Sequence, residues 1–201
     1  MVTATVFMGF VVVQVYADPL FRETVPSMSP TSCNIIFALV SIIATMVTAV
    51  VVDKVGRKML MLYSSGASAV VTLLLGTQLH VQWGPHMLTA VLIYIFCFAF
   101  SIGAGTIPYI LVYEVFLPEI KSFCSMLVLE WAWLTSFLIL LIFNPLVECL
   151  GLGPVFYIFS AFCVLTSVFC CLFQPETKGL PLDVIVTLFT APNRRTSIYQ
   201  I

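Results

Sequence analysis

The feature that most limits how this chain can fold is a series of apolar stretches, most of them long enough to cross a lipid bilayer. A bilayer core about 30 Å thick requires roughly 20 apolar residues per helix. Five stretches reach this length, and a shorter one precedes them. We therefore predict an all-α, polytopic membrane protein with about six transmembrane helices. The predicted spans are residues 2–16, 33–52, 59–78, 88–113, 123–143 and 154–173.

The composition excludes several classes of function. Charged residues make up 8% of the chain, whereas a soluble domain carries about 25%, so lipid must cover most of the surface. The net charge is -1 and no cluster of Lys and Arg stands out, which argues against nucleic-acid binding. The cysteines and histidines show no metal-ligand spacing. We expect no cofactor and no metal site, and we expect that the protein is not an enzyme.

The positions of the basic residues predict how the chain is oriented. Cytoplasmic loops near membrane spans are enriched in Lys and Arg. Seven of the eight basic residues fall on one side of the predicted spans, and only Arg22 falls on the other. We therefore expect an integral, multi-pass protein of the plasma membrane with both termini in the cytoplasm. Residues 1–174 would form a six-helix bundle, and residues 175–201 a cytoplasmic tail.

Three short motifs lie at the ends of predicted spans. The loop after the second span reads DKVGRK, residues 53–58. The fourth span contains GTIPY, residues 105–109, and is followed by EVFLPEIK, residues 114–121. The sixth span is followed by PETKG, residues 175–179. With these motifs in this order, the chain resembles the C-terminal half of the sugar porters of the major facilitator superfamily, most closely the insect facilitated trehalose transporter-like proteins.

This resemblance implies both a fold and a function. In that family the substrate lies near the membrane midplane between two six-helix halves, and each half is built from two inverted repeats of three helices. The expected function is transmembrane transport of a sugar or a related small solute by alternating access. The expected partners are the lipid bilayer, a sugar-like solute, and either a second six-helix half or a second copy of this chain.

The resemblance also implies a network of cytoplasmic charges. In the family such charges hold helix ends together in one state and separate when the two halves rock. The alternative is that these loop charges only set the membrane topology. The residues carried over to this network are Asp53, Arg57, Lys58, Glu114, Lys121, Glu176 and Lys178.

The fourth span contains a predicted helix break at Gly103, Gly105 and Pro108. Proline removes a backbone hydrogen bond and glycine permits close approach, so breaks of this kind in membrane helices lie against protein or a cavity. In the family the break acts as a gate, and the alternative is a simple packing kink. A separate polar feature is Glu130 in the fifth span, which suggests either proton coupling or a position near the cytoplasmic end of that span.

The predicted substrate-binding residues are Thr106, Pro108, Tyr109 and Trp133. Tyr109 stands where the family usually has Trp, and Trp133 occupies the Trp of the family's Asn-Trp pair. Aromatic faces suit sugar rings, and the Tyr hydroxyl can form a hydrogen bond. The alternative for each aromatic residue is ordinary packing between helices.

The chain departs from the family at four positions that usually carry sugar-binding amides. Thr5, Val6 and Val11 replace two Gln and one Asn of the first span, and Ala132 replaces the Asn before Trp133. Buried sugar hydroxyls need hydrogen-bonding partners. Two interpretations follow: a transporter whose preference has shifted toward a less polar solute, or a truncated or relic membrane protein that has lost sugar binding and does not transport.

Overall fold

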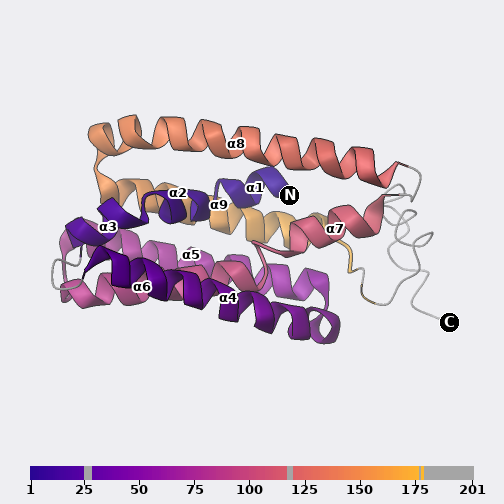
Figure 1. The fold of residues 1–201 in the computed structure, drawn as a ribbon, viewed down its shortest axis with the longest axis horizontal. Coiled ribbons are helices and arrows are strands. Elements are labelled where there is room, and N and C mark those ends of the chain that lie inside the picture. The colour runs from indigo at the N-terminus through magenta and orange to yellow at the C-terminus, as the bar shows by residue number, and fades with distance from the viewer. Residues whose placement is uncertain (25–28, 117–119, 177, 179–201) are drawn as a thin grey trace.

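The computed structural model describes residues 1–24, 29–116, 120–176 and 178, and this part of the chain is helical without strands (Figure 1). Most of the tail predicted at 175–201 lies outside the described residues. The helices are α1 (Val2–Val6), α2 (Phe10–Val15), α3 (Ala17–Thr24), α4 (Pro30–Val55), α5 (Arg57–Val81), α6 (His86–Ile102), α7 (Ile107–Val115), α8 (Lys121–Leu150) and α9 (Leu152–Phe173).

Five segments of the described part are long and apolar enough to cross a membrane. They are α4, α5, α8, α9 and the stretch His86–Tyr113, which joins α6 to most of α7. Each of the five full-length apolar stretches found in the sequence lies inside one of them. The helices extend past the apolar stretches at most of their ends, because polar residues at the level of the lipid headgroups can continue a helix.

The first predicted span, residues 2–16, is not one continuous helix. It is divided into α1 and α2 at Gly9, which has a φ of 87° in the left-handed region. A Cβ atom at Gly9 would lie 2.5 Å from the Phe159 ring of α9. Only glycine combines this backbone angle with such a close approach, so a local packing requirement interrupts an otherwise apolar helix.

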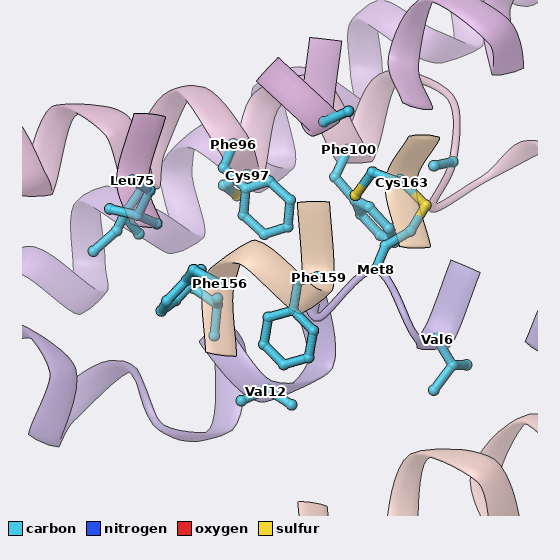
Figure 2. Packing of buried hydrophobic residues seen from close by; sticks show 14 of the residues in the cluster. Val6, Met8, Val12, Leu75, Phe96, Cys97, Phe100, Phe156, Phe159 and Cys163 are labelled. Atoms are coloured by element: carbon cyan, nitrogen blue, oxygen red, sulfur yellow. The ribbon is translucent and has the colours of Figure 1, made fainter. Parts of the chain in front are cut away.

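The core of the bundle combines aliphatic side chains with several buried phenylalanines. Helix α5 packs most extensively against α9 and then α6, while α8 lies along α1, α2 and α9. Figure 2 shows Phe156 and Phe159 of α9 in the packed interior with Met8 and Val12 from the segment around Gly9. This packing anchors the two short helices, which have too few residues to be stable alone.

The outer surface of the bundle is apolar, as expected for a protein solvated by lipid. Met46 on α4 is 68% exposed, and Leu141 on α8 and Leu165 on α9 are 60% and 61% exposed. So many large exposed hydrophobic side chains would cause aggregation in water. In a bilayer they face hydrocarbon at little cost.

The two ends of the bundle differ in charge. The α4–α5 turn, the start of α8 and the end of α9 lie at one end, on the right in Figure 1, and α3 lies at the other. The described basic residues of the first end are Lys54, Arg57, Lys58, Lys121 and Lys178, whereas α3 carries Arg22.

Candidate functional site

Two helices of the bundle are broken at equivalent places. The described helices form two successive sets of three segments. The first set is α1–α2, α4 and α5, and the second is α6–α7, α8 and α9. The first segment of each set is interrupted, at Gly9 and at residues 103–106. In transporters built from repeats, interrupted helices at corresponding positions mark the binding site, because freed backbone groups and side chains meet there. The two breaks therefore mark the candidate binding site.

The α6–α7 break depends on the close approach of α5. A Cβ atom at Gly103 would lie 2.5 Å from the Ser64 Cβ and 2.6 Å from the Leu60 carbonyl oxygen. Gly103 thus brings the end of α6 against the backbone of α5. Pro108 is the second residue of α7, a position where its missing N–H removes no helical hydrogen bond. The predicted residues therefore lie at the break, with the glycines inside it and Pro108 just beyond.

Hydroxyl side chains satisfy the backbone groups that the break exposes. The Ser64 hydroxyl donates to the Ala99 carbonyl at 2.6 Å and accepts from the Ala104 N–H at 2.9 Å. The Thr48 hydroxyl of α4 shares its proton between the Ala44 carbonyl of its own helix, at 2.8 Å, and the Ile102 carbonyl at the break, at 3.0 Å. Broken helices are tolerated in membranes when neighbouring side chains replace the lost bonds. The break is therefore stabilised by neighbouring helices as part of the fold.

A cavity of about 720 Å³ lies between the two broken helices and is flanked by α4 and α8. Its volume falls in the range of about 300–1,000 Å³ that is usual for small-molecule sites. The α6–α7 break is centred five residues from the middle of His86–Tyr113, which is about 7 Å along a helix. The residues of α8 that line the cavity lie between Ala132 and Leu140 and include the middle of that helix. The cavity therefore lies near the middle of the bilayer.

Three of the four predicted substrate-binding residues line this cavity: Thr106, Tyr109 and Trp133. Pro108 lines a second, largely apolar cavity of about 600 Å³ between α1, α7 and α8. Successive residues of a helix point about 100° apart, so Pro108 and Tyr109 face different sides of α7. The structure thus brings Thr106, Tyr109 and Trp133 together and places Pro108 elsewhere.

The cavity also has polar lining residues that the sequence analysis missed: Gln14, Ser41, Thr45, Ser101 and Ser136. Ser41 and Thr45 are four residues apart, so they share one face of α4. Isolated polar residues in apolar spans, repeated at helical spacing, were the available signal. Thr5, Val6, Val11 and Ala132, which replace the family's amides, also line the cavity.

The predicted charge network is centred on Glu176 just after α9. Its carboxylate accepts hydrogen bonds from the backbone N–H groups of Arg57, at 2.9 Å, and Lys58, at 3.2 Å. These N–H groups form the start of α5, where a negative charge is favoured by unpaired donors and the helix dipole. Gly56 has a φ of 98°, and a Cβ atom there would lie 2.6 Å from the Glu176 Oε2. The end of the DKVGRK loop, residues 56–58, is therefore in direct contact with Glu176 of the PETKG motif.

Other members of the predicted network join this contact to different degrees. Asp53 and Arg57 form an ion pair at 3.3 Å, and the Lys178 Nζ donates to the Lys54 carbonyl at 2.6 Å. Lys121 instead lies 5.5 Å from the centre of the Tyr113 ring. The side chain of Glu114 lies outside the described residues. The structure thus ties the α4–α5 turn to the end of α9 and places Lys121 apart.

Glu130 does not belong to the cavity lining. Its side chain is exposed on α8, nine residues after the start of that helix. The centre of α8 is about 8 Å further along. Among the described residues, Glu130 therefore faces outward from the six-helix unit at membrane depth.

Replacing Glu176 by Ala should loosen the α5–α9 contact. The start of α5 would lose its carboxylate acceptor, and a charge at a helix N-terminus contributes about 0.3–1 kcal/mol, or up to about 2 kcal/mol when partly buried. We expect the free energy of unfolding in detergent to fall by roughly this amount. Replacing Glu148 by Ala, at the opposite end of the bundle, is the matched control. Equal stabilities of the two variants would contradict the capping role.

Comparison with known sequences gives a consistent result. The profile of the family described as sugar (and other) transporters matches residues 1–189. The chain is 30% identical over 202 residues to a facilitated trehalose transporter Tret1 of Drosophila yakuba, covering 95% of this chain and 23% of that protein. It is 28% identical to the facilitated trehalose transporter Tret1 of Apis mellifera ligustica, covering 95% and 39%. The chain thus spans well under half the length of these relatives.

Solved structures with a similar fold are also sugar transporters. The proton:xylose symporter XylE of the major facilitator superfamily, bound to 6-bromo-6-deoxy-D-glucose, matches with a TM-score of 0.81 and 25% identity, covering 94% of this chain and 42% of that one. The inward open conformation of the xylose transporter XylE from E. coli matches with a TM-score of 0.79 and 25% identity, covering 93% and 40%.

Proposed function

Because this chain belongs to the sugar transporter family and has the fold of the major facilitator superfamily, we propose that it carries the solute-binding cavity of a facilitated, alternating-access transporter for a sugar or a related small solute. The observation that carries this proposal is the cavity of about 720 Å³ between the two broken helices. The comparisons give no support to the alternative of a non-transporting membrane protein.

The cavity has the mixed lining that a sugar requires. Tyr109 and Trp133 offer aromatic faces for the apolar side of a sugar ring, and the Thr106 hydroxyl adds a polar edge. Small-molecule sites combine apolar walls with a few well-placed polar groups. The names of the relatives make trehalose the first solute to test.

The same fold supplies elements that could move between two states. The α6–α7 break can act as a gate, since its backbone groups are held by side chains that can exchange partners. The contact of Glu176 with the start of α5 can hold the cytoplasmic helix ends in one arrangement. Alternating access would then require a second six-helix unit, which we propose packs across the open side of the cavity.

The orientation follows from the basic residues. We propose that the end with the α4–α5 turn faces the cytoplasm, because it carries five of the six described basic residues. Both termini would then be cytoplasmic. A plasma-membrane location fits a transporter that exchanges solute with the outside.

Sugar binding and sugar uptake test this function separately. The chain, reconstituted in nanodiscs, would be titrated with trehalose and glucose while tryptophan fluorescence is recorded, because Trp133 lies in the cavity. We expect a saturable change that is lost in the variant Trp133→Phe and kept in Trp83→Phe. Mannitol, which has no ring, is the control solute.

Uptake of the same labelled sugars into liposomes distinguishes the remaining outcomes. Saturable uptake by the chain would support the complete transport function. A fluorescence response without uptake would support a binding unit that needs a second six-helix unit. Correctly inserted protein with neither response would overturn the proposed function.

A further inference from the structure

Most hydroxyl groups that line the cavity donate their proton to a backbone carbonyl of the protein. Thr45 donates to the Ser41 carbonyl at 2.8 Å, Thr106 to the Ser101 carbonyl at 3.1 Å, and Ser136 to the Ala132 carbonyl at 2.8 Å. Thr5 donates in the same way to the Val2 carbonyl at 2.9 Å. Each hydroxyl has one proton to give, so these four can only accept from a solute.

The remaining two hydroxyls on small side chains are also engaged. Ser41 and Cys97 share a hydrogen bond of 3.0 Å between oxygen and sulfur. The Ser101 hydroxyl also lies beside the Cys97 thiol. The buried Cys97 thiol therefore occupies the polar groups at this wall of the cavity.

Three lining side chains retain N–H or O–H donors without a partner among the described residues: Gln14, Tyr109 and Trp133. They come from three different elements, α2, α7 and α8. Gln14 lies on the α3 side of the Gly9 break, and Tyr109 lies beyond the α6–α7 break toward the opposite end. The free donors are thus spread along the cavity.

Gln14 differs from the other two donors because its carboxamide carries an N–H donor and a separate carbonyl acceptor side by side. The Trp133 indole only donates, and the Tyr109 hydroxyl has a single proton. A carboxamide can donate to one sugar hydroxyl and accept from its neighbour, which fits a pair of adjacent hydroxyls on a ring. Gln14 is the only carboxamide that lines the cavity within the described residues.

The backbone that carries Gln14 is held in place by packing on both sides. Phe10, at the start of α2, stacks on Phe100 with ring centres 4.5 Å apart and planes 6° apart. Tyr16, just after α2, packs on Phe143 at 4.8 Å. Val12 and Val13 between them are almost completely buried. This packing fixes the rotation of α2, and a fixed backbone is what a selective polar contact needs.

From these contacts we infer that Gln14 is the residue that selects the solute, by binding two adjacent hydroxyl groups of a polyol ring at the α3 end of the cavity. This role would compensate for the family's amide side chains that Thr5, Val6 and Val11 replace in α1 and α2. The inference rests on the proposed function, since it assigns a specificity-determining residue to that site.

Fluorescence titration with glucose and the series of monodeoxyglucoses tests the inference. For the unchanged chain we expect that removing either of two adjacent hydroxyls weakens binding by about 10-fold. Gln14→Leu should bind glucose roughly 10- to 100-fold more weakly and should no longer distinguish those two analogues. Gln14→Asn, which keeps the amide on a shorter side chain, should retain part of the discrimination and decides the matter if Gln14→Leu does not fold.

Thr77→Val is the matched control, because Thr77 lies on α5 outside the cavity lining and donates its proton to the Leu74 carbonyl at 2.8 Å. We expect its affinity for glucose to stay within about threefold of the unchanged chain. If the unchanged chain binds sugar and Gln14→Leu binds it equally well with the same preferences, this inference is overturned while the proposed function stands. If the unchanged chain responds to no sugar, the proposed function fails and this inference fails with it.

Discussion

Replacing Gly9 by Ala is expected to lower the free energy of unfolding by about 2–5 kcal/mol and to abolish sugar binding. The left-handed backbone at Gly9, with φ of 87°, costs an L-residue about 1–2 kcal/mol. The new Cβ would also lie 2.5 Å from the Phe159 ring, and overpacking of a core costs about 1–3 kcal/mol. Both penalties fall on the segment that orients α2 and the cavity wall. Unfolding in detergent and fluorescence titration would measure the two effects.

A rescue experiment separates the two penalties. Phe159→Ala removes the ring, so the double variant Gly9→Ala with Phe159→Ala should be more stable than the sum of the single effects predicts. The backbone strain would remain. Gly66→Ala is the matched control, because the nearest atom to a Cβ there, the Ser167 Oγ, is 3.9 Å away. Strictly additive effects would show that Phe159 is not the obstacle.

The long helices were predictable because lipid imposes a simple rule on sequence. Where no water is available, backbone groups must bond within the helix, so a run of about 20 apolar residues indicates a span. The stretch 33–52 inside α4 and the stretch 154–173 inside α9 follow this rule. The motif positions also identified the family, which the family profile over residues 1–189 confirms.

The break in the first span was not predictable from apolarity alone. Residues 6–13 around Gly9 carry no polar side chain, and glycine is tolerated inside membrane helices. What breaks the helix is the Phe159 ring, which is 150 residues away in sequence. A long-range contact of this kind leaves no local signal.

The polar lining of the cavity was predicted only in part for a similar reason. Thr106, Tyr109 and Trp133 were found through family motifs, whereas Gln14 lies outside every motif. Its importance depends on which other donors are already used, as in the bond from Thr106 to the Ser101 carbonyl. Which donors already have a partner can be seen only in the three-dimensional structure.

Replacing Gly103 by Ala is expected to lower the free energy of unfolding by about 3–5 kcal/mol and to weaken sugar binding strongly. The Cβ would meet the Ser64 Cβ at 2.5 Å and the Leu60 carbonyl oxygen at 2.6 Å, an overpacking cost of about 1–3 kcal/mol. Moving the break away from α5 would also strain the bonds of Ser64 to the Ala99 carbonyl and the Ala104 N–H, each contributing about 1 kcal/mol. Because Thr106 follows this break directly, the wall of the cavity would move as well.

Unlike the Gly9 variant, this one should resist rescue. Ser64→Gly removes one of the two obstructing atoms, but the Leu60 carbonyl belongs to the backbone of α5 and stays in place. The same change deletes the hydroxyl that bridges the break, so the double variant should be no more stable than Gly103→Ala alone. Gly66→Ala is again the control, because the nearest atom to a Cβ there, the Ser167 Oγ, is 3.9 Å away. If Ser64→Gly restored stability or binding, side-chain crowding rather than backbone contact would explain why glycine is required at 103.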